Sequence, residues 1–76
     1  MEQDWRRTLL GRNIQLIRLE KHMKQKEVVE ALRKKGISMS RRMFSNIETG
    51  RKNVSVSELR GLKEIFDISY DEFFRE

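Results

Sequence analysis

The sequence predicts an all-α fold of five short helices, and three observations lead to this prediction. Apolar residues recur at helical spacing in several segments, capping residues mark both ends of some of them, and alternation of apolar and polar residues never lasts long enough for a strand. The 76 residues contain no proline and no linker-like stretch. We therefore expect a single domain over residues 1–76, near the lower size limit for a self-sufficient core.

The first two helices are predicted from one apolar face and one stop signal. A helix over residues 5–21 places Ile14 and Ile17 on the same face. A second helix begins near residues 24–25 and ends at Gly36, which follows a run of three cations. Cations in a last turn followed by glycine are typical of a helix C-terminus.

The third helix, residues 41–49, has signals at both ends. Ser40 is a suitable N-cap, and Gly50 stands where a left-handed C-terminal residue is needed. Phe44 and Ile47 share one face and are expected to anchor this helix to the core.

Two further helices are predicted from capping boxes. Ser55 precedes Glu58 by three residues, and Ser69 precedes Glu72 by the same spacing. The expected core collects apolar residues from four of the helices: Leu10, Ile14, Ile17, Val28, Leu32, Phe44, Ile47, Leu59, Leu62 and Phe66.

Composition narrows the functional classes. Residues 1–54 carry 14 Lys/Arg against 6 Asp/Glu, a net charge of +8, whereas residues 55–76 carry 3 against 6, a net charge of −3. A basic body indicates a polyanionic partner, although a solvated basic surface is the alternative. There is no cysteine, so disulfides and thiolate metal sites are excluded. No apolar run approaches the ~20 residues of a membrane span, and a cytoplasmic protein is expected.

The polar side chains of the third helix are of the types that read DNA bases. Arginine pairs with guanine through two hydrogen bonds, and asparagine pairs with adenine in the same way. The helix supplies Arg41, Arg42, Ser45 and Asn46. Taken alone, the same pattern also fits an ordinary amphipathic helix with a solvated basic face.

Residues 10–74 resemble the phage-repressor helix-turn-helix family of the Cro/XRE type. The resemblance lies in an apolar–Gly opening, an Ile and an Arg four residues apart, a Gln opening the second helix, an Ile-Glu-x-Gly motif and an apolar-Ser-x-Asp-Glu-apolar ending. These are Leu10-Gly11, Ile14, Arg18, Gln25, Ile47-Glu48-Thr49-Gly50, Arg51, Ser55, Leu59 and Ile68-Ser69-Tyr70-Asp71-Glu72-Phe73. The resemblance implies a compact five-helix, lambda-repressor-like DNA-binding domain with its helix-turn-helix core at about 24–50.

The family likeness also implies roles for particular residues. The third helix would read bases with Arg41, Arg42, Ser45 and Asn46. An ion pair between Arg18 and Glu48 would tie the first helix to the end of the third. The resemblance also implies that Gln25 contacts a DNA phosphate. From their positions beside Gln25 or directly after the third helix, further phosphate contacts are expected from Lys24, Lys26, Arg51, Lys52 and Asn53. No cofactor and no metal is implied.

This chain departs from the family pattern at several positions. The connection between Leu32 and Ser40 is about five residues longer than usual, as in a subset of the family with an extended second helix. His22 and Asp67 stand where the family prefers a C-terminal glycine. Lys24 replaces the usual Ser or Thr cap, so the second helix lacks that side-chain acceptor.

The first helix has a second apolar stripe, formed by Trp5, Leu9, Leu16 and Leu19, opposite its core face. Two accounts of this stripe remain open. It packs against aromatic residues of the C-terminal segment, or it forms a face for a dimer or another partner. Those aromatic residues are Tyr70, Phe73 and Phe74, and in the second account they belong to the same dimer or partner face as the stripe.

The function expected from these features is sequence-specific binding of double-stranded DNA by a transcriptional regulator, a repressor acting as a homodimer. The alternative is a DNA-binding antitoxin or phage-immunity component that also binds a protein partner. An enzyme is not expected, because His22 is the only histidine and no nucleophile or acid–base set is present.

Overall fold

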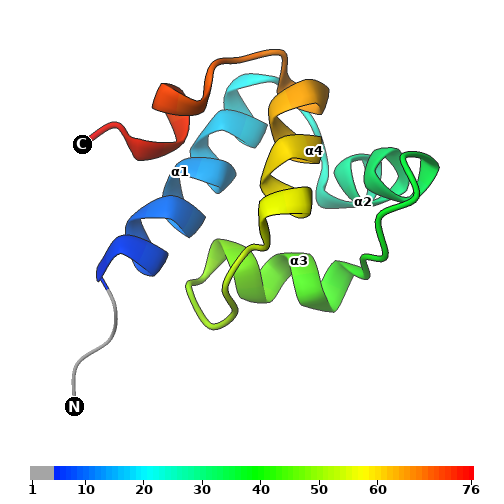
Figure 1. The fold of residues 1–76 in the computed structure, drawn as a ribbon, viewed down its shortest axis with the longest axis horizontal. Helices are drawn as coiled ribbons and strands as arrows, with labels where there is room; N and C mark the ends of the chain where they lie inside the picture. Colours follow the sequence, from blue (N-terminus) through cyan, green and yellow to red (C-terminus); the bar gives the residue numbers. More distant parts are fainter. Residues whose placement is uncertain (1–4) are drawn as a thin grey trace.

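The computed structural model describes the backbone of residues 5–76 and the side chains from residue 7 onward. The described chain is all-helical, as the sequence predicts. It comprises α1 (Trp5–Glu20), α2 (Gln25–Lys34), α3 (Arg41–Glu48), α4 (Val56–Phe66) and the short 3-10 helix η1 (Tyr70–Phe74). Helix α3 runs across one end of the molecule and contacts α1 and α2, whereas α4 packs on α2 and η1 lies against α1 (Figure 1).

The expected fifth α-helix is instead a single 3-10 turn. The Ser69 side chain makes no capping hydrogen bond, so the predicted capping box with Glu72 does not form in full. The Glu72 amide donates to the Ser69 carbonyl at 3.1 Å, which is the i to i+3 pattern of a 3-10 helix. With only five residues, this segment is too short for an α-helix to stabilise itself, and tertiary contacts decide its form.

The core is assembled from every helix and includes three phenylalanines, Phe44, Phe66 and Phe73. Its other fully buried apolar members are Ile14, Ile17, Val28, Val29, Leu32, Met39, Ile47 and Leu62. Two residues of the predicted core, Leu10 and Leu59, are only partly buried.

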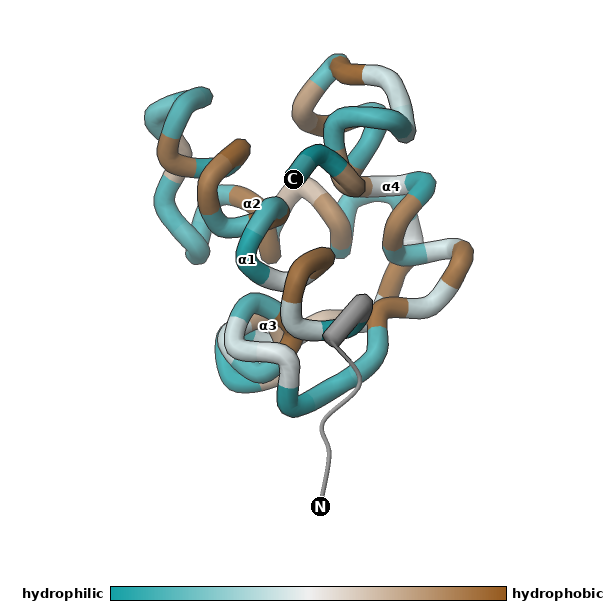
Figure 2. The backbone as a smooth tube through the Cα atoms, turned by 90° about the vertical axis from the view of Figure 1, so that its left-hand side faces the viewer, coloured by the Kyte–Doolittle hydropathy of each residue, from teal (hydrophilic) through white to brown (hydrophobic). Residues whose placement is uncertain are grey.

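Hydrophilic positions of α3 lie at the lower-left edge of the molecule in Figure 2.

Each of the four α-helices within residues 5–76 is followed by a residue in the left-handed conformation. Two of these residues are glycines, Gly36 (φ 84°) and Gly50 (φ 80°). The other two are His22 (φ 57°) and Asp67 (φ 56°), at positions where the family pattern has glycine. Backbone hydrogen bonds then close each helix end in the same manner, for example from Met23 N–H to the Arg18 carbonyl at 3.0 Å.

Gly11 allows α1 and α3 to meet backbone against backbone. A Cβ atom at this position would lie 2.2 Å from the Ile47 carbonyl oxygen and 2.8 Å from that of Glu48. Both carbonyls belong to the last turn of α3. Only glycine permits this approach without a shift of one helix.

Candidate nucleic-acid interface

Helix α3 begins and ends where its capping residues predict. The Ser40 hydroxyl accepts a hydrogen bond from the Met43 amide at 3.1 Å. At the other end, Arg51 N–H donates to the Asn46 carbonyl at 2.8 Å, across the left-handed Gly50. The helix is therefore fixed at both ends by local interactions.

One face of α3 is anchored in the core and another faces solvent. Phe44 and Ile47 are fully buried. The side chains of Arg41 and Arg42 are exposed in the first turn, and Ser45 and Asn46 are half-buried. The structure thus presents the four predicted base-reading residues on one short helix that the core holds in place.

A buried network fixes the end of α3 to α1 and α2. Arg18 Nε lies 2.7 Å from Glu48 Oε2, and Arg18 Nη2 lies 3.2 Å from Oε1, so the ion pair implied by the family resemblance is present and bidentate. The side chains of Arg18 and Glu48 are only 10% and 1% exposed. Arg18 also donates to the Met23 carbonyl at 3.0 Å, just after α1.

Gln25 has a partner within the protein that sequence reasoning did not anticipate. Its side-chain amide donates to Glu48 Oε1 at 2.8 Å, so Gln25 joins the Arg18–Glu48 pair. Lys24 and Lys26, on either side of Gln25, are exposed. The side-chain nitrogen of Gln25 therefore supports α3, while the two lysines form an exposed basic edge at the start of α2.

The start of α2 also has a cap that the sequence reading missed. Lys24 supplies no side-chain acceptor, as expected, but Glu27 Oε1 accepts a hydrogen bond from the Lys24 backbone N–H at 2.7 Å. This is the second half of a capping box. The glutamate three residues into the helix is the signal that could have predicted it.

The long connection between α2 and α3 is held by side chains at both ends. Arg33 Nε donates to the Met39 carbonyl at 2.9 Å. Lys35 Nζ lies 2.8 Å from Glu64 Oε1 of α4. The hydrogen bond and the charge of Lys35 lower the pKa of Glu64 below its ordinary value. These contacts fix the extra residues against α2 and α4, so the longer connection has a defined conformation.

The residues after α3 form the second part of the basic surface. Arg51 and Asn53 are exposed, and Lys52 is half-buried. The Lys52 backbone N–H donates to the Asn46 carbonyl at 3.1 Å, which joins this segment to α3. The two predicted sets of phosphate-contacting residues thus lie on either side of α3 in the chain, one at the start of α2 and one after α3.

The second apolar stripe of α1 is only partly covered. Leu16 is 39% exposed and Leu19 is 53% exposed, whereas Leu9 is half-buried. The inclusion of Phe73 in a possible dimer or partner face is wrong, because Phe73 is fully buried in the core. Tyr70 and Phe74 are exposed, and the side chain of Trp5 lies outside the described residues.

Asn13 has a structural role that no sequence motif indicates. Its side-chain amide donates to the carbonyls of Phe73 and Arg75, both at 2.8 Å. An ion pair between Arg75 Nη2 and Glu20 Oε1 at 2.9 Å adds a second link to α1. The pKa of Arg75 is raised by its hydrogen bond to Glu20. These contacts hold the C-terminal segment on α1.

No known protein family, curated protein or solved structure gives a significant match to this chain. The resemblance to the phage-repressor family is therefore supported only by the sequence motifs of this chain described above. Among residues 5–76, the longest helices are too short or too polar to cross a bilayer.

Proposed function

We propose that this chain binds double-stranded DNA sequence-specifically and regulates transcription, as a repressor acting in homodimeric form. The observation that carries the proposal is the way α3 is held. Phe44 and Ile47 anchor it to the core, and the buried Arg18–Glu48 pair fixes its end. A helix held in this way can present Arg41 and Arg42 in a fixed orientation.

The proposed mechanism divides recognition between two kinds of contact. The first turn of α3 enters the major groove, where Arg41, Arg42 and Asn46 read base edges. The exposed lysines at the start of α2 and Arg51 after α3 bind phosphates and set the register of the protein on the duplex. The net charge of +5 favours association with DNA.

The exposed leucines of α1 support a homodimer. They are also compatible with the second candidate function, a DNA-binding antitoxin or phage-immunity component. Leu16 and Leu19 are solvent-exposed apolar side chains on one face of α1. An apolar face of this kind fits a second copy of the chain, or the partner of a DNA-binding antitoxin or phage-immunity component. Two-fold symmetry of a homodimer would require a palindromic operator.

Selection from random duplex DNA, with the size of the complex measured in the same run, tests this function. We expect enrichment of a palindromic site and binding that weakens steeply with salt. If roughly five to seven basic groups neutralise phosphates, log K against log salt has a slope of roughly −4 to −6. A flat response to salt, or no enriched sequence, would contradict the proposal and favour a protein-binding adaptor.

A further inference from the structure

One side of α1 carries apolar side chains that the rest of the described chain covers only in part. Leu16 and Leu19 are 39% and 53% exposed on this side, and Leu9 is half-buried. The core residue Ile14 lies about 160° from Leu16 around the helix, because each residue turns the helix by about 100°. The exposed leucines therefore form a surface that points away from the core.

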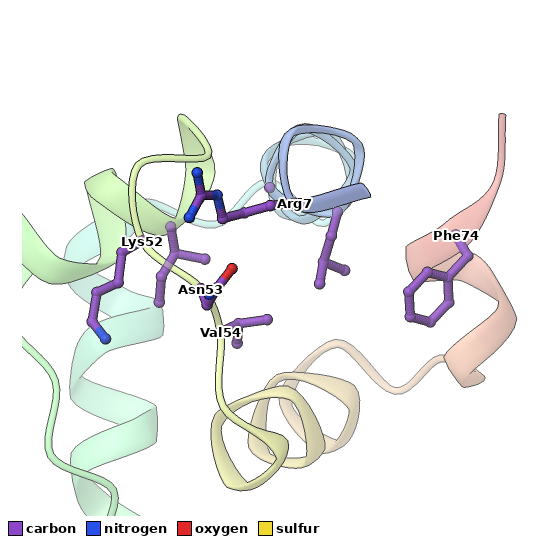
Figure 3. A pocket seen from close by; sticks show the side chains of 8 residues that line it. Arg7, Lys52, Asn53, Val54 and Phe74 are labelled. Carbon is purple, nitrogen blue, oxygen red and sulfur yellow. The ribbon is translucent and has the colours of Figure 1, made fainter. Parts of the chain in front are cut away.

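Phe74, an exposed aromatic residue of η1, belongs to a different surface. Its ring faces a cavity of about 200 Å³ that Val54 and Leu10 also line (Figure 3). Leu10 packs against the core and lies about 120° from Leu16 around α1. A partner that covers the exposed leucines is therefore recognised by other residues of α1, without Phe74.

Two opposite charges flank Leu16 at equal distances along α1. Arg12 precedes Leu16 by four residues and Glu20 follows it by four, so each lies about 6 Å from Leu16 along the helix axis. Around the helix they lie about 40° to either side of Leu16. Both side chains are exposed. The charges on this side of α1 are thus symmetric in position about Leu16 and opposite in sign.

Both charged groups can accept a partner from outside the chain. Within the part of the chain that the structure describes, the Arg12 side chain takes part in no hydrogen bond or ion pair. Glu20 Oε1 lies 2.9 Å from Arg75 Nη2, but the Glu20 side chain is still 58% exposed. A carboxylate has two oxygens, so Glu20 can bind a second cation.

A second copy of the chain has the charges that this surface requires. If two α1 helices pack antiparallel and cross at Leu16, Arg12 of each copy lies at the same level along the axis as Glu20 of the other. Two-fold symmetry then forms the pair twice. A parallel arrangement would instead place like charges together. Packed helices lie about 8–10 Å apart, a distance that an arginine and a glutamate side chain span together.

We propose that the chain self-associates through an antiparallel α1–α1 contact, in which Leu16 and Leu19 pack together and two Arg12–Glu20 ion pairs join the copies. The proposal rests on the homodimer of the proposed function and specifies its geometry. The leucines supply the affinity, and the charges select the antiparallel orientation. Because the contact is small, we expect a Kd of about 10–100 µM. Well below this concentration the chain is monomeric, and substitutions of exposed Arg12 leave its stability unchanged.

Charge reversal, followed by sedimentation equilibrium, tests the contact. Arg12→Glu places a carboxylate against Glu20 of the other copy at both symmetric positions, and we expect the Kd to rise about tenfold. Lys21→Glu makes the same change of charge at an exposed position on the opposite side of the helix and should leave the Kd unchanged. Arg12→Lys keeps the cation and should stay within about threefold of the unaltered protein.

A mixture of two variants tests the antiparallel pairing itself. Glu20→Arg should associate as weakly as Arg12→Glu, but an equimolar mixture of the two should associate as tightly as the unaltered protein. Each ion pair in the mixed dimer again has one acidic and one basic member. Both variants keep a net positive charge, so general attraction does not bring them together. Circular dichroism checks the fold of Glu20→Arg, which loses its link to Arg75.

The outcomes separate this contact from the proposed function. Equal weakening by Arg12→Glu and Lys21→Glu, or no association in a mixture of folded variants, would overturn the α1–α1 contact and leave a homodimer of another geometry. If Glu20→Arg does not fold, the comparison of Arg12→Glu with Lys21→Glu decides by itself. A chain that stays monomeric at millimolar concentration would overturn the homodimer as well, whereas selection from random duplex DNA tests DNA binding independently.

Discussion

The guanidinium group of Arg18 binds both carboxylate oxygens of Glu48, although thirty residues separate the two in the chain. Gln25 donates to the same carboxylate, so one buried Glu48 side chain connects α1, α2 and α3. The position of the proposed recognition helix therefore depends on a charge in the interior. Such a charge is tolerated only while its partners are present.

Removal of Arg18 should destabilise the domain. In Arg18→Ala, Glu48 remains buried without its cation, and we expect a loss of about 3 kcal/mol in the free energy of unfolding. Urea denaturation followed by circular dichroism measures this change. The double variant Arg18→Met/Glu48→Met should recover much of the loss, because it removes both charges. A single variant as stable as the unaltered protein would show that the pair does not stabilise the fold.

Asn46 and Lys52 should affect DNA binding in different ways. Asn46→Ala should cost roughly 1–3 kcal/mol on the preferred duplex and relax preference at one base pair. Lys52→Ala should weaken preferred and scrambled duplexes by the same factor, because a phosphate contact carries no sequence information. Fluorescence anisotropy with both duplexes separates the two effects. An equal loss on both duplexes for Asn46→Ala would mean that α3 does not read bases.

Asn13 should hold the C-terminal segment on α1. Asn13→Ala leaves the carbonyls of Phe73 and Arg75 without their donor, and we expect a loss of roughly 1–3 kcal/mol. Hydrogen exchange should also become faster at the amides of η1. Arg12→Ala, at an exposed position beside Asn13, is the control and should change neither quantity. Unchanged exchange in Asn13→Ala would show that the two hydrogen bonds are dispensable.

Replacement of His22 by glycine should stabilise the domain. His22 has a φ of 57°, a conformation that is unfavourable for residues with a Cβ atom. We expect His22→Gly to raise the free energy of unfolding by about 0.5–1 kcal/mol. Asp67→Gly should give a smaller gain, because aspartate adopts this conformation more readily. Thermal denaturation of the two variants compares them, and a less stable His22→Gly would refute the explanation.

The exposed leucines of α1 should mediate self-association. In Leu19→Glu a charge replaces a side chain that is 53% exposed, so a homodimer formed through this face should dissociate into monomers. Sedimentation velocity measures the change. Val56→Glu is the matched control, since Val56 is an 85% exposed apolar residue on α4. Identical sedimentation of Leu19→Glu and the unaltered protein would place the dimer contact elsewhere.

Local signals in the sequence were sufficient to predict most helix boundaries. Ser40, Ser55, Gly36 and Gly50 act within a few residues of their own positions, and the structure has the caps that they predict. The prediction of an α-helix beginning at Ser69 was wrong, because it relied on local signals alone. Its capping motif is local, but the form of η1 depends on tertiary contacts with α1.

Features that depend on distant residues could not be predicted in this way. Asn13 bonds to residues about sixty positions away, and nothing near it in the sequence distinguishes it from a surface asparagine. Gln25 was predicted to contact phosphate from the family resemblance, but its tie to Glu48 required the packing of α2 on α3. The exposure of Leu16 and Leu19 likewise depends on which parts of α1 the other helices cover.

The position of α3 relative to α1 depends on Gly11, a residue without a side chain. Because a Cβ atom there would lie 2.2 Å from the Ile47 carbonyl oxygen, even alanine would act as a wedge between the two helices. The wedge would displace the two helices relative to each other without altering any residue on the exposed face of α3. A chain with the same α3 sequence but no glycine at this position must therefore hold that helix in a different position relative to α1. Similarity of the exposed residues alone would not indicate that two such proteins present those residues in the same orientation.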